Sequence, residues 1–205
     1  SMWWMFKSFY HRANDPHSCT YEDYYGHGHA LNVFIRRSHG AGPYRDQDVY
    51  FEHAVECGVV ANLEGWGSES GRAYWRSWSN DLGYDMRWQA YGSTSLIEPI
   101  AGFGDPDYLI KSGTFANKTI RQAAPYLMNG LLHAQGNGGG WFYGSNNCYS
   151  GMQNGPWCNA WSSTSDLSTT GWAPEALRML ERKLGVASAQ ERKNRMRNWL
   201  DSHAS

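Results

Sequence analysis

The stretch Leu131–Trp141, with the sequence LLHAQGNGGGW, decides the fold. An apolar helical face ends at Gln135, four glycines follow within five positions, and then comes a tryptophan. Glycines allow a tight reversal of the chain, and a large aromatic side chain can fill the space between neighbouring helices. The stretch therefore predicts the closure of a helical hairpin. It does not predict a phosphate-binding loop, because no Lys-Ser/Thr pair follows the glycines.

Helix, glycine-rich turn and tryptophan recur upstream. Apolar residues follow helical spacing from Asp46 to Leu63, and Gly65-Trp66-Gly67 comes next. Residues 70–78 are expected to be helical at their start. A short helix is predicted over Ser93–Ile100, stopping near Pro99.

Three further helices are predicted downstream. Residues 117–135 carry an apolar stripe, with Pro125 as a kink or in the first turn. A helix capped within 168–170, with Pro174 in its first turn, is expected to end at Gly185. A capping box at 188–191 opens a last helix that ends near residue 200. Because no sustained strand alternation is visible, the sequence predicts a mainly α protein, a single domain over residues 1–205 with long Trp/Gly-rich loops.

The composition limits the classes of partner. The 205 residues include 18 Lys and Arg against 19 Asp and Glu, so the net charge of −1 argues against nucleic acid. No apolar run is long enough for a membrane span. The 11 Trp and 13 Tyr exceed what core packing needs, and their flat apolar faces with a polar edge suit sugar rings. No cofactor is expected.

The four cysteines bear on the compartment. A disulfide between Cys148 and Cys158 closes a Gly/Asn-rich loop and fits a secreted or periplasmic protein, while free buried thiols are the alternative, and the same two states are open for Cys19 and Cys57. The first residues lack a basic leader and a cleavage site, so we expect that a signal or an upstream domain is missing and that the chain is a fragment of a larger protein in the second case.

Several of these motifs resemble α/α toroids. Gln135-x-x-x-Gly139-x-Trp141 matches the core of the QW repeat of terpenoid cyclases and prenyltransferases, although Gly130 stands where an aromatic residue usually precedes Leu131. Residues 166–186 resemble an inner-helix segment of the same toroids.

A second resemblance lies near the start of the chain. Gly26-His27-Gly28-His29, followed by Asn32, Gly40-Ala41-Gly42-Pro43 and Tyr50-Phe51, is similar to an uncharacterised bacterial toroid family with a Gly-His motif. The two resemblances imply a partial or short α/α toroid of stacked helical hairpins, because six hairpins need more residues than this chain has.

A cluster of polar residues at 24–39 supplies the groups that a polysaccharide lyase needs. A uronate lyase needs a group that neutralises the carboxylate, a base for the C5 proton and an acid for the leaving oxygen. The interpretation takes His29 or His27 as base, Tyr25 as acid, and Asn32 with Arg36 as carboxylate binders. The alternative is a Gly-His-Gly-His loop whose polar side chains are structural.

A metal site and a glycoside hydrolase are the two other chemistries that the sequence offers. His27 and His29 can ligate a metal with His17, Asp23 or His39, but no closed metal signature is present, and none is predicted. A glycoside hydrolase needs two carboxylates, for which Glu64 and Glu69 are the candidates. The aromatic residues expected to stack on sugar there are Trp66, Trp75 and Trp78.

The function predicted first is a secreted enzyme that cleaves a polysaccharide, by β-elimination if the substrate is a uronate. A non-catalytic module that binds glycan or protein is the second hypothesis. An isoprenoid-type toroid enzyme is the third, with Asp107 of Asp105-Pro106-Asp107-Tyr108 as a lone acid, although Tyr108 replaces an aspartate of the DxDD-type motif.

Overall fold

The computed structural model describes residues 59, 63, 65–75, 90–136, 138–141, 167–187 and 190–203. Within them, 60% of residues are helical, and the remaining regular structure is one two-stranded sheet. The mainly α class is therefore confirmed for the described residues. Their helices are α4 (Ala90–Gly102), α5 (Ile120–His133), α7 (Leu167–Leu184) and α8 (Gln190–His203).

A β-hairpin stands where the sequence analysis expected the end of one helix and the start of another. Strand β1 (Trp66–Glu69) pairs antiparallel with β2 (Arg72–Trp75). Ser70 and Gly71 link the strands with φ values of 51° and 75°. Positive φ at both turn residues matches the strand twist in two-residue hairpins. The expected helical start at Ser70 was therefore wrong.

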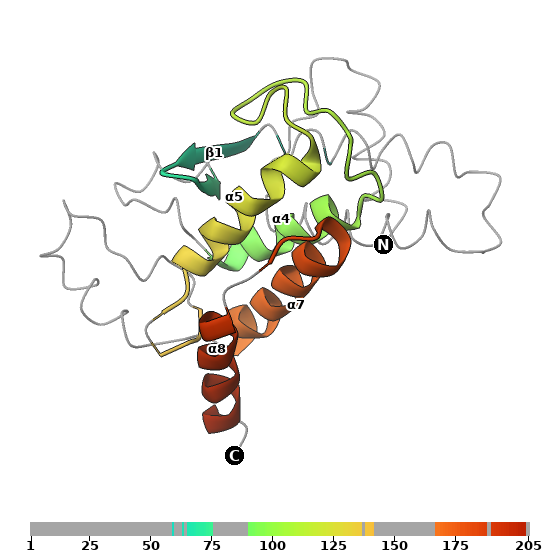
Figure 1. Ribbon diagram of the computed structural model, residues 1–205. Coiled ribbons are helices and arrows are strands. Elements are labelled where there is room, and N and C mark those ends of the chain that lie inside the picture. The colour runs from blue at the N-terminus through green and yellow to red at the C-terminus, as the bar shows by residue number, and fades with distance from the viewer. Residues whose placement is uncertain are drawn as a thin grey trace, which may run out of the picture.

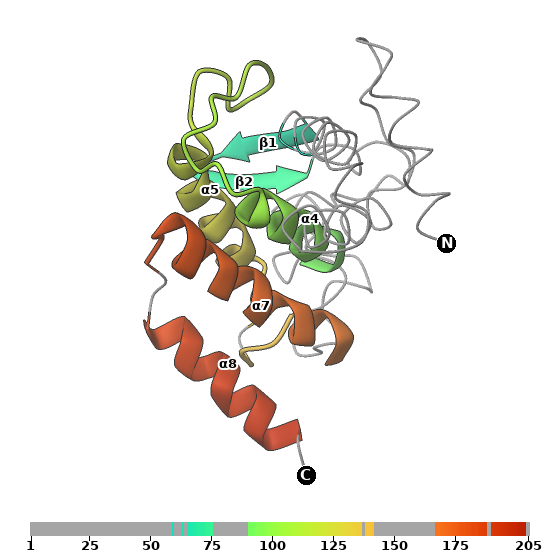
Figure 2. The same cartoon turned by 90° about the vertical axis from the view of Figure 1, so that its right-hand side faces the viewer.

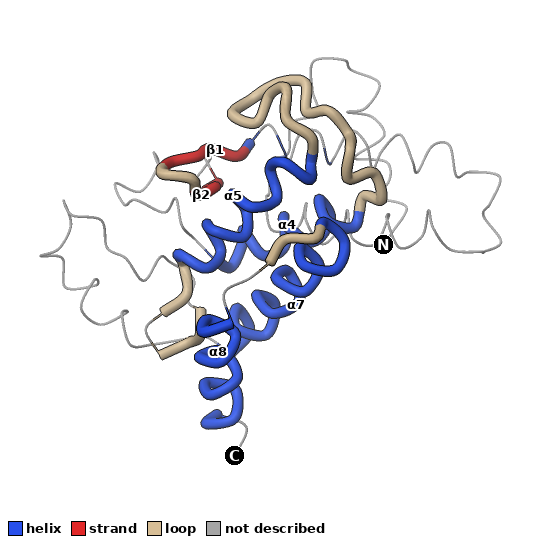
Figure 3. The backbone as a smooth tube through the Cα atoms, viewed as in Figure 1, coloured by secondary structure: helices blue, strands red, loops and turns tan. Residues whose placement is uncertain are grey.

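The hairpin and the helices are stacked in succession. Figure 2 shows the hairpin over α5 and α4, with α7 below them and α8 beyond α7. Strand β2 packs on α5, both α4 and α5 contact α7, and the α4–α7 contact is the most extensive. Figure 3 shows the same arrangement with the strands and helices in separate colours. Burying each helix's apolar face requires these neighbours, because a single amphipathic helix exposes it.

The core lies between α4, α5 and α7. Its buried side chains from these helices include Leu96, Ile97, Ile100, Leu127, Leu131, Leu177 and Leu180. The apolar stripe predicted for α5 is the one that faces this core. No helix among the described residues has the length and apolarity needed to span a membrane.

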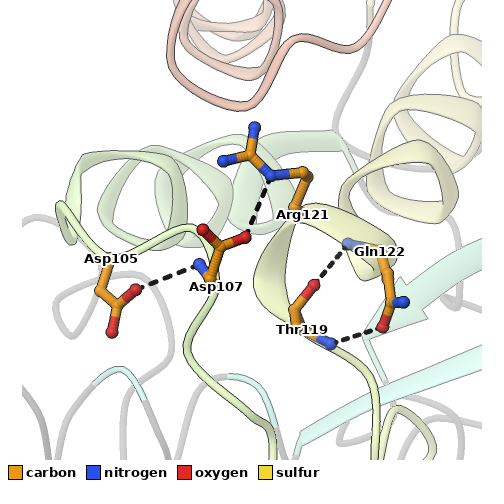
Figure 4. A network of polar contacts seen from close by, with 5 residues as sticks. All are labelled: Asp105, Asp107, Thr119, Arg121 and Gln122. Atoms are coloured by element: carbon orange, nitrogen blue, oxygen red, sulfur yellow. Dashed lines mark hydrogen bonds and ion pairs between the residues drawn. The ribbon is translucent and has the colours of Figure 1, made fainter.

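Helix α5 begins with a capping box that the sequence analysis did not identify. The Thr119 hydroxyl accepts from the Gln122 backbone N–H at 3.2 Å, and the Gln122 side chain accepts from the Thr119 backbone N–H at 2.9 Å. Figure 4 shows both bonds. Pro125 is the sixth residue of the helix, so it lies beyond the first turn. The reciprocal cap satisfies two backbone donors that a helix N-terminus leaves open.

Two other helix boundaries differ from the prediction. Helix α7 starts at Leu167, so Thr170 lies inside it and Pro174 is its eighth residue. The Thr170 hydroxyl does not cap the helix, because it bonds to the Trp141 backbone. Helix α4 continues past Pro99 to Gly102. The predicted stop of α7 at Gly185 is confirmed, with a left-handed φ of 71°.

Candidate functional site

The predicted catalytic residues are outside the described residues. They are Tyr25, His27, His29, Asn32 and Arg36. Glu64 and Trp78, predicted to bind substrate, also lie outside them, as do the four cysteines. Trp75 closes β2, where the structure describes its backbone and not its side chain. Trp66 and Glu69 are the two predicted site residues whose side chains are described.

Trp66 does not present its ring to a ligand. Its side chain is 1% exposed and belongs to the hydrophobic core. Alternation along the strands places it on the same face of the hairpin as buried Ala73, and β2 packs against α5. The expectation that Trp66 stacks on a sugar was therefore wrong, because both faces of its indole are covered.

The other face of the hairpin is polar. It carries Glu69 and Arg72, which lie directly opposite one another in the register, and Tyr74 opposite Gly67. A Cβ at Gly67 would be 2.6 Å from the Tyr74 ring, so glycine makes room for that ring. An opposed Glu–Arg pair stabilises a hairpin modestly and places both charges on one surface.

Helix α5 carries two polar side chains to the hairpin turn. Asn129 Nδ2 donates to the Gly71 carbonyl at 3.1 Å, and His133 follows four residues later on the same side of the helix. Gly130 permits the close approach, because a Cβ there would be 2.0 Å from the Ala73 carbonyl oxygen. Asn129 and Gly130 thus set α5 directly against the hairpin.

The glycine-rich turn after α5 fits against helix α8. Gln135 Nε2 donates to the Gly139 carbonyl at 2.7 Å and to the Arg192 carbonyl at 3.1 Å. Gly139 has a φ of 103°, and a Cβ there would meet the Arg195 carbonyl at 2.2 Å. Only glycine therefore allows the turn to lie this close to α8.

Trp141 closes the same turn from inside. Its side chain is 0% exposed, and Nε1 donates to the Leu131 carbonyl at 2.8 Å. Its backbone exchanges two hydrogen bonds with the Thr170 hydroxyl, at 2.9 and 3.1 Å. The indole thus satisfies a carbonyl in the last turn of α5 while its backbone ties the turn to α7. The tryptophan of the stretch Leu131–Trp141 is therefore a buried structural residue.

His133 is the last residue of α5 and is partly buried. Burial lowers the pKa of the His133 imidazole, the charges of Arg72 and Arg192 lower it further, and the Glu69 carboxylate opposes them. The imidazole is consequently neutral at pH 7, with two cations and one anion close enough to act on it. We call Glu69, Arg72, Asn129, His133 and Arg192 the His133 cluster.

The cluster has the chemistry of an anion site with a base. Guanidinium groups bind carboxylates with paired hydrogen bonds, and a neutral imidazole accepts a proton near neutral pH. The described segments 167–187 and 190–203 add seven Lys or Arg side chains against four Asp or Glu. This excess gives the C-terminal helices a positive field, although the whole chain is close to neutral.

Asp107 is not placed as a buried acid. Its carboxylate pairs with Arg121 Nε at 3.2 Å, and its side chain is 72% exposed. Its backbone N–H bonds to the Asp105 side chain at 3.1 Å, so the two aspartates form an exposed turn (Figure 4). An acid that protonates an alkene needs a dry apolar cavity, so the isoprenoid hypothesis loses its proton donor.

Sequence reasoning missed most of the cluster. His133 lies in the stretch LLHAQGNGGGW, where the glycines and the tryptophan predict a structural role. A signal was available at Asn129 and His133, since polar residues four apart opposite an apolar stripe share a helix face. Nothing in the spacing connects them with Arg72 or Arg192. No family model, curated protein or solved structure matches this chain.

Proposed function

We propose that the protein binds an acidic polysaccharide at the His133 cluster and cleaves it by β-elimination at a uronate residue. The observation that carries this proposal is a half-buried imidazole in α5 whose pKa is lowered by burial and by the charges of Arg72 and Arg192. The proposal keeps the class of reaction expected from the sequence. It assigns the role of the base to His133 and the binding of the carboxylate to Arg72 and Arg192, in place of the residues at 24–39.

Each group has a definite task in the elimination. Arg72 and Arg192 bind the uronate carboxylate and stabilise the negative charge that develops when the C5 proton leaves. His133 takes that proton, the electron pair forms the C4–C5 double bond, and the bond from C4 to the glycosidic oxygen breaks. An acid then protonates the leaving oxygen. Tyr74, on the same hairpin face as Arg72, is the described candidate, and Tyr25 is the candidate from the sequence.

The architecture and location are proposed with the function. The hydrogen bonds of Gln135 and Trp141 support a short α/α toroid, because they tie one helical hairpin to its neighbours as stacked hairpins require. A long polysaccharide is found outside the cytoplasm in most settings where it is degraded, so we propose a secreted or periplasmic enzyme.

The test is the ultraviolet absorbance of the unsaturated uronate product. We would incubate the full chain with a panel of uronate polymers that differ in sugar and linkage. We expect His133→Gln to lower the rate by about 10²–10⁴-fold, the usual contribution of a general base. Arg72→Met and Arg192→Met should each raise KM by about 10- to 100-fold, the worth of one charged hydrogen bond. Lys183→Met removes an exposed positive charge from α7 and should leave the rate unchanged.

Two outcomes would reject the lyase. One is no absorbance rise with any polymer and no binding. The other is tight binding of one polymer, weakened by Arg72→Met and Arg192→Met, with no product. That second result would establish the non-catalytic glycan-binding module in place of the enzyme.

A further inference from the structure

One face of α5 carries a row of polar side chains along the length of the helix. They are Gln122, Tyr126, Asn129 and His133, at spacings of four, three and four residues. Residues at these spacings share one face of a helix, and the buried apolar residues of α5 lie on the other side. With a rise of about 1.5 Å per residue, the row is about 16 Å long.

The hairpin and the loop before α5 border this row. Asn129 Nδ2 donates to the Gly71 carbonyl at 3.1 Å, so the row passes the hairpin turn. Toward the start of the helix, Lys118 holds its ammonium over the Tyr126 ring, 5.9 Å from the ring centre. In Figure 1 the loop leads into the first turn of α5, and the hairpin lies beside the helix. A polar strip therefore extends from Lys118 to His133.

Tyr126 is fixed in place and remains accessible. Its ring packs edge-on against the buried Phe115, with centroids 5.5 Å apart and planes at 62°. Tyr126 and Lys118 are both partly buried. Part of the phenol and part of the lysine side chain therefore face solvent, while the ring is held by the loop.

Lys118 and Tyr126 together have the chemistry of a subsite for an acidic sugar. A phenol offers a flat apolar surface and a hydroxyl, which match the C–H face and the hydroxyls of a pyranose ring. A lysine ammonium has three donors and pairs with a carboxylate. No carboxylate of the described residues pairs with Lys118, so its charge is left for a ligand.

We propose that Lys118 and Tyr126 form a second sugar subsite, which binds a uronate residue further along the same polysaccharide chain than the one at His133. Tyr126 and His133 are seven residues apart in one helix, so their backbones are about 10 Å apart along its axis. A single sugar does not reach both side chains, whereas an acidic polysaccharide lying along α5 contacts both. The inference rests on the proposed function for its ligand and on the contacts of α5 for its site.

The test is how affinity depends on the length of the oligosaccharide. Calorimetry measures the binding of galacturonate, mannuronate and glucuronate oligomers, from the disaccharide to the hexasaccharide. The full chain carries His133→Gln, so that no cleavage intervenes. We expect affinity to rise with length. Lys118→Met should lower hexasaccharide affinity about 10-fold, the worth of one charged hydrogen bond. The disaccharide should lose less, and Tyr126→Leu should shorten the gain with length in the same way.

Arg121→Met is the matched control, because it removes a charge of the same sign from the same end of α5. Arg121 is exposed, lies off the row and pairs with Asp107. Its loss should leave every affinity unchanged. An equal fall in Arg121→Met and Lys118→Met would mean general attraction of anions and would overturn the subsite. So would an unchanged length dependence in Lys118→Met, whose side chain is outside the core, if Tyr126→Leu does not fold.

The binding series and the lyase assay separate this subsite from the proposed function. Length-dependent binding that Lys118→Met weakens, with no unsaturated product from the unaltered protein, would refute the lyase and leave the subsite in place. Product formed with the same KM on a long polymer by Lys118→Met and by the unaltered protein would refute the subsite and leave the lyase. Failure of every oligomer to bind would overturn the subsite as well.

Discussion

Two helical glycines of this protein should respond to alanine with opposite signs. Gly130 is buried in α5, and a Cβ there would be 2.0 Å from the Ala73 carbonyl oxygen. Gly171 lies exposed in α7, and a Cβ there would have nothing within 4 Å. Because both positions are helical, the gain in helix propensity is the same for both, and the surroundings decide the difference.

The magnitudes follow from these surroundings. Alanine in place of a helical glycine stabilises by about 1 kcal/mol. At Gly130 the hairpin backbone must retreat from 2.0 Å toward the 3.4 Å of ordinary contact, which corresponds to the upper end of overpacking costs, about 3 kcal/mol. The same retreat weakens the Asn129–Gly71 bond, worth about 1 kcal/mol. We therefore expect Gly130→Ala to lose about 3 kcal/mol and Gly171→Ala to gain about 1 kcal/mol.

Urea unfolding followed by far-ultraviolet circular dichroism measures both variants. In a thermal melt followed by the same signal, a chain of this size changes its melting temperature by about 2–4 °C per kcal/mol. The melting temperatures of the two variants should therefore lie on opposite sides of that of the unaltered protein. Equal slopes against urea would show that the unfolded state is the same. A Gly130→Ala variant as stable as the unaltered protein would refute the close approach of α5 and the hairpin.

Three further outcomes follow from single contacts. Trp141→Phe should lower the free energy of unfolding by about 2–4 kcal/mol, because the Leu131 carbonyl loses its buried donor and a cavity remains; circular dichroism melting measures it. Thr119→Ala should cost about 1 kcal/mol in the same assay through the lost bond to the Gln122 N–H, while a loss below a few tenths would contradict the capping box. The lowered pKa of His133 means that the unfolded chain binds its proton first, so stability should fall as the pH drops below about 6.5. As the pH drops through that window, the midpoint urea concentration should fall less steeply in His133→Gln than in the unaltered protein. Equal slopes against pH would refute the lowered pKa.

The sequence predicted two of the described helices by different signals. An apolar stripe identified α5, because burial of such a face is what stabilises a helix in a protein. Candidate caps and a terminal glycine identified α7. The predicted positions of the helix ends were less accurate. Thr170 was expected to cap α7, since threonine favours that position, but its hydroxyl is used by the Trp141 backbone from a distant part of the chain.

The hairpin was missed for a physical reason. Its strands have four residues each, too few for alternation to be distinguished from the surrounding Trp, Tyr, Gly and Ser. The turn Ser70-Gly71 was the remaining local signal, and its first residue is not one that strongly favours a positive φ. What stabilises these strands is packing of Trp66 and Ala73 in the core, which no local pattern contains.

The candidate site could not be predicted from the spacing of residues along the sequence either. Arg72 comes from a strand, His133 from the end of α5 and Arg192 from α8, and only the packing of these elements brings them together. The residues chosen from the sequence were chosen because they lie close together along the chain. Catalytic groups in folded proteins more often come from separate elements, so nearness in sequence is a poor guide to a site.

The glycine-rich turn nevertheless links the part that was predicted to the part that was not. Its tryptophan satisfies α5 from within the core, and its glutamine bonds outward to the backbone of α8. Helix α8, which extends toward the C-terminus in Figure 1, is also held by Met196, which packs against the core, and by the buried Trp199. The turn after α5 therefore joins α5, α7 and α8 through hydrogen bonds of buried side chains.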